Sequence, residues 1–255
     1  MPEFHFDTIK TFPSIFSKYS LNSNEYITGG TENISYPLNL LRKQRKFNLK
    51  IKVEAKKIMN SEMREKLLLM AAEDQSVREE LAKTGELFDG YHPRMEAVHL
   101  ANAAALEKMI EDAGGEWLGK SLVGSDGAEA AWLIAQHSIS LPDFSRRCLR
   151  LLRRAVAAGE AESRQMAYLE DRINFFERKP QRYGTQSDRN ADGKMQVWTL
   201  EDESRVNEFR ASVGLKPLEN LVRESEELRG NAPADFARRQ KEAEEWREKT
   251  GWTTK

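Results

Sequence analysis

The chain has 255 residues, 32% charged and 39% hydrophobic, and its 40 basic and 41 acidic residues give a net charge of −1. This balance argues against a protein that binds polyanions over its whole surface. The single cysteine, Cys148, excludes an internal disulfide and a multi-cysteine zinc site. No apolar run approaches the ~20 residues that a membrane helix needs, and the N-terminus lacks the apolar segment of a secretory signal. We therefore expect a cytoplasmic protein that does not enter a membrane.

The composition changes near residue 57. Residues 1–57 contain one alanine and carry ten basic and five acidic residues, whereas residues 58–255 contain 24 alanines and carry 30 basic and 36 acidic residues. Short apolar pieces in the first segment are broken by Pro13 and Pro37. We expect residues 1–57 to form a poorly ordered or separate N-terminal extension. Its basic cluster, from Arg42 to Lys46, is alternatively a nucleic-acid or membrane patch.

From residue 58 onward the apolar spacing is helical. Ser61 is predicted to cap a first helix that ends at Gly85. Four more helices are then predicted, bounded by proline, glycine and capping residues, at 93–114, 125–137, 140–159 and 163–178. The sequence thus predicts an all-α fold, a compact bundle of about five helices.

An irregular, partly helical C-terminal tail is expected after this bundle. A strand is predicted at 195–200, and helices at 203–213 and 218–228. The last predicted helix, 234–249, is mostly charged, and we expect it to project from the fold. The predicted domains are therefore residues 1–57, a helical domain over residues 58–228, and a charged C-terminal helix within residues 229–255.

Polar residues on apolar helix faces are the main functional signal. His99 and Asn102 lie on neighbouring ridges of the second predicted helix. His137 continues the apolar stripe of the third, beside Trp132. Because buried polar groups must be satisfied, these residues imply a polar network. It is either structural or the lining of a site where histidine transfers protons, for which His99 and His137 are the catalytic candidates.

A second polar group follows the fifth predicted helix. Asp171 and Arg172 lie on that helix, and the loop Pro180–Gln186 adds further hydrogen-bonding side chains, which are typical of a surface turn or of the rim of a ligand site. Because short connections favour antiparallel neighbouring helices, we expect His99, His137 and one residue of this loop to line one pocket. The candidate ligand-binding residues are His92, Asn102, Trp132, Asp171, Arg172, Tyr183 and Gln186.

No residue is assigned as a metal ligand, and the sequence identifies no cofactor. A weaker alternative is that His99 and His137 bind zinc or iron together with one carboxylate of Asp89, Asp126 or Asp171.

Several sequence blocks resemble a known family. They are GELFDGYHP (85–93), MEAVH (95–99), SLVGSDGAEAAWLIAQH (121–137), PQRYGTQ (180–186) and GLKPLE (214–219). Together they resemble a bacterial domain-of-unknown-function family over residues 62–225. The resemblance implies a single domain in that range and a bacterial cytoplasmic setting. Since the family has no established activity, it implies no catalytic residue.

Three functions are compatible with these observations. The first is a helical enzyme, a hydrolase or transferase, whose histidines act on a small molecule and whose Arg172 or Arg182 holds an anionic group. The second is a protein–protein interaction or immunity-type module without catalysis, which predicts an exposed apolar patch. The third, nucleic-acid binding through the basic patches and the arginines of the fourth helix, is disfavoured by the acidic balance of the domain.

Overall fold

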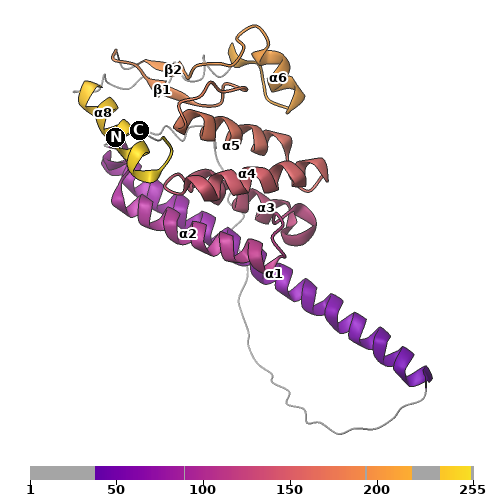
Figure 1. Ribbon diagram of the computed structural model, residues 1–255. Coiled ribbons are helices and arrows are strands. Elements are labelled where there is room, and N and C mark those ends of the chain that lie inside the picture. The colour runs from indigo at the N-terminus through magenta and orange to yellow at the C-terminus, as the bar shows by residue number, and fades with distance from the viewer. Residues whose placement is uncertain (1–37, 89, 193, 220–235, 254–255) are drawn as a thin grey trace. The chain divides into compact units, whose positions relative to one another are not determined.

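The computed structural model describes residues 38–88, 90–192, 194–219 and 236–253 (Figure 1). The described residues fall into two units, the first from Asn60 onward and the second before Asn60. Most of the predicted N-terminal extension, most of the predicted helix at 218–228, and Asp89 lie outside the described residues. The candidate site belongs to the first unit, which is described below.

Five helices form the body of this unit, as the sequence predicts. They are α1 (Leu38–Thr84, of which the part from Asn60 belongs here), α2 (Pro93–Asp112), α3 (Lys120–His137), α4 (Pro142–Ala157) and α5 (Ser163–Phe176). A short 3₁₀ turn, η1 (Glu86–Phe88), joins α1 to α2. The helix α3 contacts α2, α4 and α5, and α4 packs along α5. The all-α prediction is confirmed.

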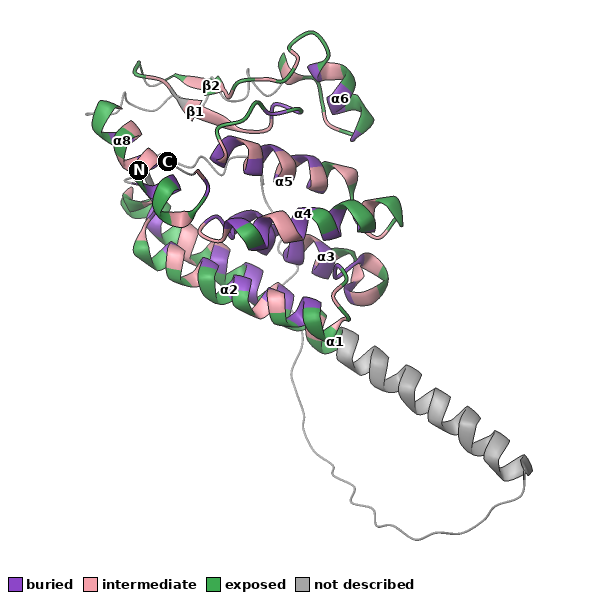
Figure 2. Cartoon of the chain, in the orientation of Figure 1, coloured by how far each residue is buried: buried purple, intermediate pink, exposed green. Residues whose placement is uncertain are grey.

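The central position of α3 follows from its composition. Every residue from Ala130 to Ala135 is apolar, and every residue from Ala130 to Ile139 is buried. A helix that is apolar all round is stable only when other helices cover it on all sides. Figure 2 shows the result: buried residues gather on the facing sides of the helices and exposed residues on their outer faces.

The smaller elements follow α5 in the chain. Strands β1 (Ser187–Arg189) and β2 (Met195–Val197) form an antiparallel hairpin in which Ser187 pairs with Val197, and α6 (Val206–Ser212) comes next. These elements correspond to the strand and the helix predicted at 195–200 and 203–213. The last element is α8 (Phe236–Thr250).

One predicted helix start is wrong. The first helix begins at Leu38 rather than at Ser61, because residues 38–60 contain no glycine or proline and are rich in good helix formers. The third predicted helix does begin at Ser125, because the backbone at Gly124 is not helical; a short helical segment from Lys120 precedes it within α3. At Gly124 φ is 75° and ψ is 167°, a conformation that is essentially restricted to glycine.

The expectation that the charged C-terminal helix projects from the fold is also wrong. Trp246 of α8 packs against Tyr91 and Phe176, with ring centroids 5.9 and 5.6 Å apart. Just beyond the helix, the Trp252 indole donates a hydrogen bond of 2.6 Å to the carbonyl of Ile139. Two buried tryptophans therefore outweigh the charge of the remaining residues.

None of the helices in the described ranges is both long enough and apolar enough to span a bilayer.

A buried aspartate between two histidines

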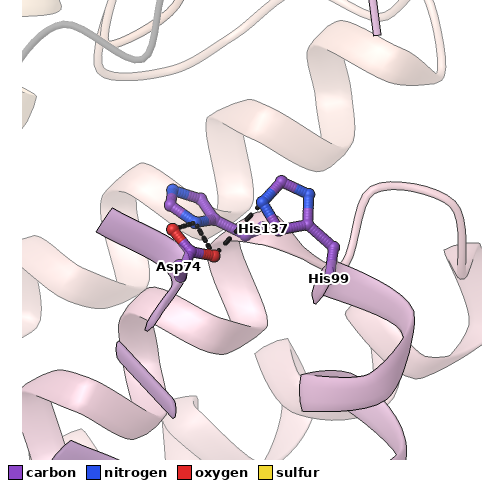
Figure 3. A group of neighbouring side chains, drawn as sticks. All are labelled: Asp74, His99 and His137. Carbon is purple, nitrogen blue, oxygen red and sulfur yellow. Dashed lines mark hydrogen bonds and ion pairs between the residues drawn. The ribbon is translucent and has the colours of Figure 1, made fainter. Parts of the chain in front are cut away.

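Three helices each contribute one polar side chain to a cluster in the core. Asp74 comes from α1, His99 from α2 and His137 from the last position of α3. Their exposed fractions are 1%, 3% and 5%. As Figure 3 shows, the Asp74 carboxylate lies between the two imidazoles and is turned toward both. We refer to these three residues as the Asp–His–His cluster.

Asp74 is buried because of its place on α1. It follows Leu67, Met70 and Ala71 at helical spacings of seven, four and three residues, and all three are buried. A carboxylate on such a face must be paired, because an isolated buried charge is very costly. The partners that satisfy it come from α2 and α3.

His137 is the closer partner of the carboxylate. Its Nδ1 lies 2.9 Å from Oδ1 and 2.8 Å from Oδ2 of Asp74. In the neutral ring, Nδ1–H donates to the carboxylate, and the lone pair is on Nε2.

His99 faces the same carboxylate with its Nε2, whereas His137 uses Nδ1. Its Nε2 lies 3.2 Å from Asp74 Oδ2, and its Nδ1 lies 2.8 Å from the hydroxyl of Tyr91. When the Tyr91 hydroxyl donates to Nδ1, the proton of the neutral ring is on Nε2 and faces Asp74. The centroids of the two imidazoles are 5.0 Å apart.

The electrostatics of the cluster favour an ionised carboxylate beside a neutral imidazole. Burial by itself raises the pKa of Asp74, but the charge and hydrogen bonds of His137 and His99 outweigh it and hold this pKa well below its usual range. Burial lowers the pKa of His137 to about 4, against the attraction of Asp74, and the positive charge of Arg172 acts in the same direction as burial.

The cluster has the donor set of a metal site. One donor atom from each of the three side chains lies within 4.8 Å of the other two. Two imidazole nitrogens and a carboxylate oxygen are ligands that zinc and non-haem iron use. Tyr91 occupies the position of an outer partner, because it holds the His99 nitrogen that faces away from Asp74.

The structure brings together the two catalytic candidates, His99 and His137, as the antiparallel arrangement of α2 and α3 predicts. His137 is also more buried than His92, as its place on an apolar stripe predicts: their side chains are 7% and 22% exposed. His92 instead caps α2, where its Nδ1 accepts from the Arg94 N–H at 3.2 Å. Its Nε2 pairs with Glu86 at 3.1 Å.

Two predicted ligand-binding residues connect helices to one another. The Asn102 amide donates a hydrogen bond of 3.2 Å to the Met70 carbonyl, joining α2 to α1. The Trp132 indole donates one of 2.9 Å to the Gln165 carbonyl, joining α3 to α5. These contacts account for the burial of both polar groups.

The predicted convergence of Tyr183 or Gln186 on the histidines is not what the structure shows. The buried Asp171 carboxylate accepts hydrogen bonds from the backbone N–H groups of Arg182, Tyr183 and Thr185, at 2.8–3.1 Å. This holds the loop against α5, because one carboxylate collects three backbone donors. The side chains of the two predicted residues have other partners. Tyr183 packs in a small apolar cluster with Ala167, Phe209 and Val213, and the Gln186 amide donates to Thr185 Oγ1.

Arg172 is a predicted ligand-binding residue outside the cluster that contacts the backbone next to it. Its Nη1 donates a hydrogen bond of 3.0 Å to the carbonyl of Gln136, the residue that precedes His137. Burial lowers the pKa of Arg172 to about 9, with a further contribution from the positive charge of Arg78.

The carboxylates considered for a metal site from sequence are not those that the structure selects. Asp126 pairs with Arg64 through an Nε–Oδ1 contact of 2.8 Å, and Asp171 holds the loop. Asp74 and Tyr91 are the residues that the sequence reasoning missed. Asp74 could have been found because it is a carboxylate on an otherwise apolar helix face, whereas Tyr91 sits in a loop without periodicity.

The arginine-rich face of α4 is largely paired with acidic residues. Four of its five arginines form ion pairs at 2.7–3.4 Å with glutamates of other segments: Arg146 with Glu177, Arg147 with Glu107, Arg153 with Glu170, and Arg154 with Glu116. Partners of opposite charge reduce the capacity of this face to bind phosphates.

The fold and the site together define a helical-bundle domain with a buried carboxylate–imidazole centre. A family described as "Family of unknown function (DUF6624)" matches residues 61–232, and the chain belongs to this family. Searches of curated proteins and of solved structures found no match.

Proposed function

We propose that this domain is a metal-dependent enzyme that acts on a small molecule by hydrolysis or group transfer. Its centre is the Asp–His–His cluster, in which His99, His137 and Asp74 bind a divalent transition metal such as zinc or iron. The observation that carries the proposal is the meeting of three buried donor atoms, from three different helices, within 4.8 Å of one another.

The protonation states of the cluster support a metal more than they support proton transfer by histidine alone. A metal requires neutral imidazole and ionised carboxylate, and the pKa shifts of His137 and Asp74 favour those forms at neutral pH. A general base works best with a pKa near the working pH, whereas the pKa of His137 is about 4. A bound metal supplies the missing reactivity, because it lowers the pKa of a coordinated water toward neutrality.

Metal-free acid–base catalysis is the second candidate. It is favoured by the direct contacts of His137 Nδ1 with both oxygens of Asp74, at 2.8 and 2.9 Å. In this arrangement Asp74 orients the imidazole, and the lone pair on Nε2 accepts the proton of a substrate. The proton that His137 shares with Asp74 occupies the place that a metal would take, so the two candidates exclude each other.

Metal titration of the purified protein tests the first candidate. After treatment with EDTA and its removal, Co²⁺ is added and its visible absorption is recorded, and Zn²⁺ binding is measured by calorimetry. We expect one metal per chain. Asp74→Asn is expected to weaken binding by about a hundredfold or more, because removing a ligand costs at least as much as removing an outer partner of a ligand, which costs about 10–100-fold. His92→Ala is the matched control, because His92 lies outside the cluster.

The results separate the two candidates. Absence of stoichiometric metal binding, or equal binding by the wild type and Asp74→Asn, refutes the metal centre. In that case, metal-independent hydrolysis of p-nitrophenyl acetate that is lost in His137→Gln and kept in His92→Ala would support acid–base catalysis.

The setting that we propose is a bacterial cytoplasm, with a small-molecule substrate. It rests on the sequence resemblance and on the single, buried, free cysteine, Cys148, since disulfides are rare in that compartment.

A further inference from the structure

Tyr91 connects the Asp–His–His cluster to the last helix of the domain. Its hydroxyl lies 2.8 Å from His99 Nδ1, and its ring stacks on the imidazole with centroids 5.6 Å apart. Trp246 of α8 packs against the Tyr91 ring with an interplanar angle of 83°. The same tyrosine therefore contacts a residue of the cluster and a residue of α8. This helix begins at Phe236, beyond the residues 61–232 that the family match covers.

Trp246 is held in place by contacts of its own. It is 4% exposed, and its ring centroid lies 5.6 Å from that of Phe176, which also stacks on Trp252 at 5.1 Å. The Trp252 indole donates to the carbonyl of Ile139, two residues after His137. Aromatic pairs at these separations stabilise the packing beyond their buried area. The tyrosine thus has a firmly packed neighbour on α8.

The hydrogen bond of Tyr91 determines which nitrogen of His99 can bind a metal. A neutral imidazole has one N–H and one lone pair, and only the nitrogen with the lone pair can coordinate. The nitrogen of His99 that faces Asp74 is Nε2, at 3.2 Å from Oδ2. Coordination through Nε2 therefore requires the ring proton to be on Nδ1, where the Tyr91 hydroxyl is the hydrogen-bond partner.

A tyrosine hydroxyl suits this position because it can both donate and accept a hydrogen bond. It donates to Nδ1 of His99 when the ring proton is on Nε2, and it accepts when that proton is on Nδ1. Burial raises the pKa of Tyr91, so the hydroxyl keeps its own proton in both arrangements. The Ser140 hydroxyl hydrogen-bonds that of Tyr91 and donates to Glu96 Oε1 at 2.9 Å. Without the tyrosine hydroxyl, an Nδ1–H group would be buried without this partner.

We propose that Tyr91 is a positioning residue of the metal centre and that Trp246 of α8 keeps it in that position. The Tyr91 hydroxyl holds the His99 proton on Nδ1 and leaves the Nε2 lone pair for the metal. This inference rests on the proposed function and deepens it, because it adds to the site a helix that lies beyond the family match.

Zinc binding by the full-length protein tests the role of Tyr91. Metal is removed with EDTA, the chelator is removed, and the Zn²⁺ affinity is measured by calorimetry. Tyr91→Phe keeps the ring, and we expect it to bind Zn²⁺ about 10–100-fold more weakly than the wild type, the effect of losing an outer partner of a ligand. Its visible Co²⁺ spectrum is expected to shift, because the His99 ring loses the contact that orients it. Tyr168→Phe removes a hydroxyl from a ring that packs on Trp132; it is the matched control and should bind as the wild type does.

The role of α8 is tested in the same way. Trp246→Leu removes the aromatic contact with Tyr91 and should weaken Zn²⁺ binding by about tenfold, the lower end of the effect of losing the outer partner itself. Trp246→Phe keeps an aromatic ring beside Tyr91 and should restore most of the affinity. Trp198→Leu is the matched control, because Trp198 makes a contact of the same geometry, at 5.2 Å, with Phe175 instead of Tyr91.

Urea unfolding in EDTA establishes that each variant is folded before it is titrated, so that a loss of stability is not mistaken for a loss of metal binding. Wild-type Zn²⁺ affinity in Tyr91→Phe overturns the role of Tyr91. Wild-type affinity in Trp246→Leu, or an equal loss in Trp198→Leu, overturns the role of α8. If Trp246→Leu does not fold, Trp246→Met, which keeps a large apolar side chain, decides in its place.

The same measurements separate this inference from the proposed function. Absence of zinc binding by the wild type refutes the metal centre and this inference together. Zinc binding by the wild type that is unchanged in Tyr91→Phe and Trp246→Leu refutes only the inference and leaves the metal centre standing.

Discussion

Acid should destabilise the fold through His137. This histidine is almost fully buried, and its pKa falls from an ordinary 6.5 to about 4 in the folded protein. Between these two values the unfolded chain binds a proton that the folded protein does not. The contribution of His137 to stability is therefore complete above pH 6.5 and is lost as the pH falls toward 4.

The size of this effect follows from the difference between the two pKa values. Each unit corresponds to about 1.36 kcal/mol, so the fold loses about 3 kcal/mol between pH 7 and pH 4 through this group. The lowered pKa of Asp74 also affects stability, but at a lower pH than His137 does. Its contribution is present above the ordinary value of 3.8 and is lost below it, outside this window.

The assay is urea unfolding, followed by circular dichroism in EDTA at several pH values from 7 to 4, for the wild type and His137→Gln. Glutamine can still donate a hydrogen bond to Asp74 but does not titrate. We expect the free energy of unfolding of the wild type to fall by about 3 kcal/mol more than that of the variant. Titrating groups that do not contact His137, including Asp171, are common to both proteins and cancel in this comparison. Asp74 does not cancel, because His137 helps to lower its pKa; the rise of this pKa in the variant stabilises the variant in acid and so changes the comparison in the expected direction. A difference between the two proteins that does not change with pH would refute the reasoning.

Three further predictions concern the fold around the site. Asp171→Asn should lower the free energy of unfolding in urea by about 3 kcal/mol, because the backbone N–H groups of the loop lose a charged acceptor and face an amide N–H group instead. Equal stability of the variant and the wild type would contradict this role of the carboxylate. Gly124→Ala should cost about 1–3 kcal/mol in the same assay, because φ is 75° and an added Cβ would lie 3.1 Å from Asp126 Oδ1, whereas Gly115→Ala has open space around it and isolates the contribution of φ alone. A chain that starts at Met59 should keep the helical signal of the domain per residue and a cooperative transition; aggregation or a non-cooperative transition would show that the removed residues are part of the core.

Much of the fold could be predicted from local sequence signals. The ends of α2 and α4 follow from prolines at the first helical position and from glycines beyond the last, since these residues act through the backbone of their own segment. The start of α1 could not be predicted in this way, because a serine at a potential cap is tolerated inside a helix when nothing else interrupts the chain. The position of α8 depended on where Trp246 and Trp252 find apolar partners, which are far away in the sequence.

The candidate site could likewise be predicted only in part from the sequence. The sequence by itself determined that His99 and His137 are buried polar residues on neighbouring antiparallel helices, because periodicity and short connections are local properties. Only the tertiary structure decided that Asp74 is the carboxylate between them and that Tyr91 holds the outer nitrogen of His99. The physical reason is that the rotation and packing of α1 against α2 and α3 determine which carboxylate lies beside the histidines. Periodicity places a residue on a face of its own helix but does not say which residue of another helix it meets.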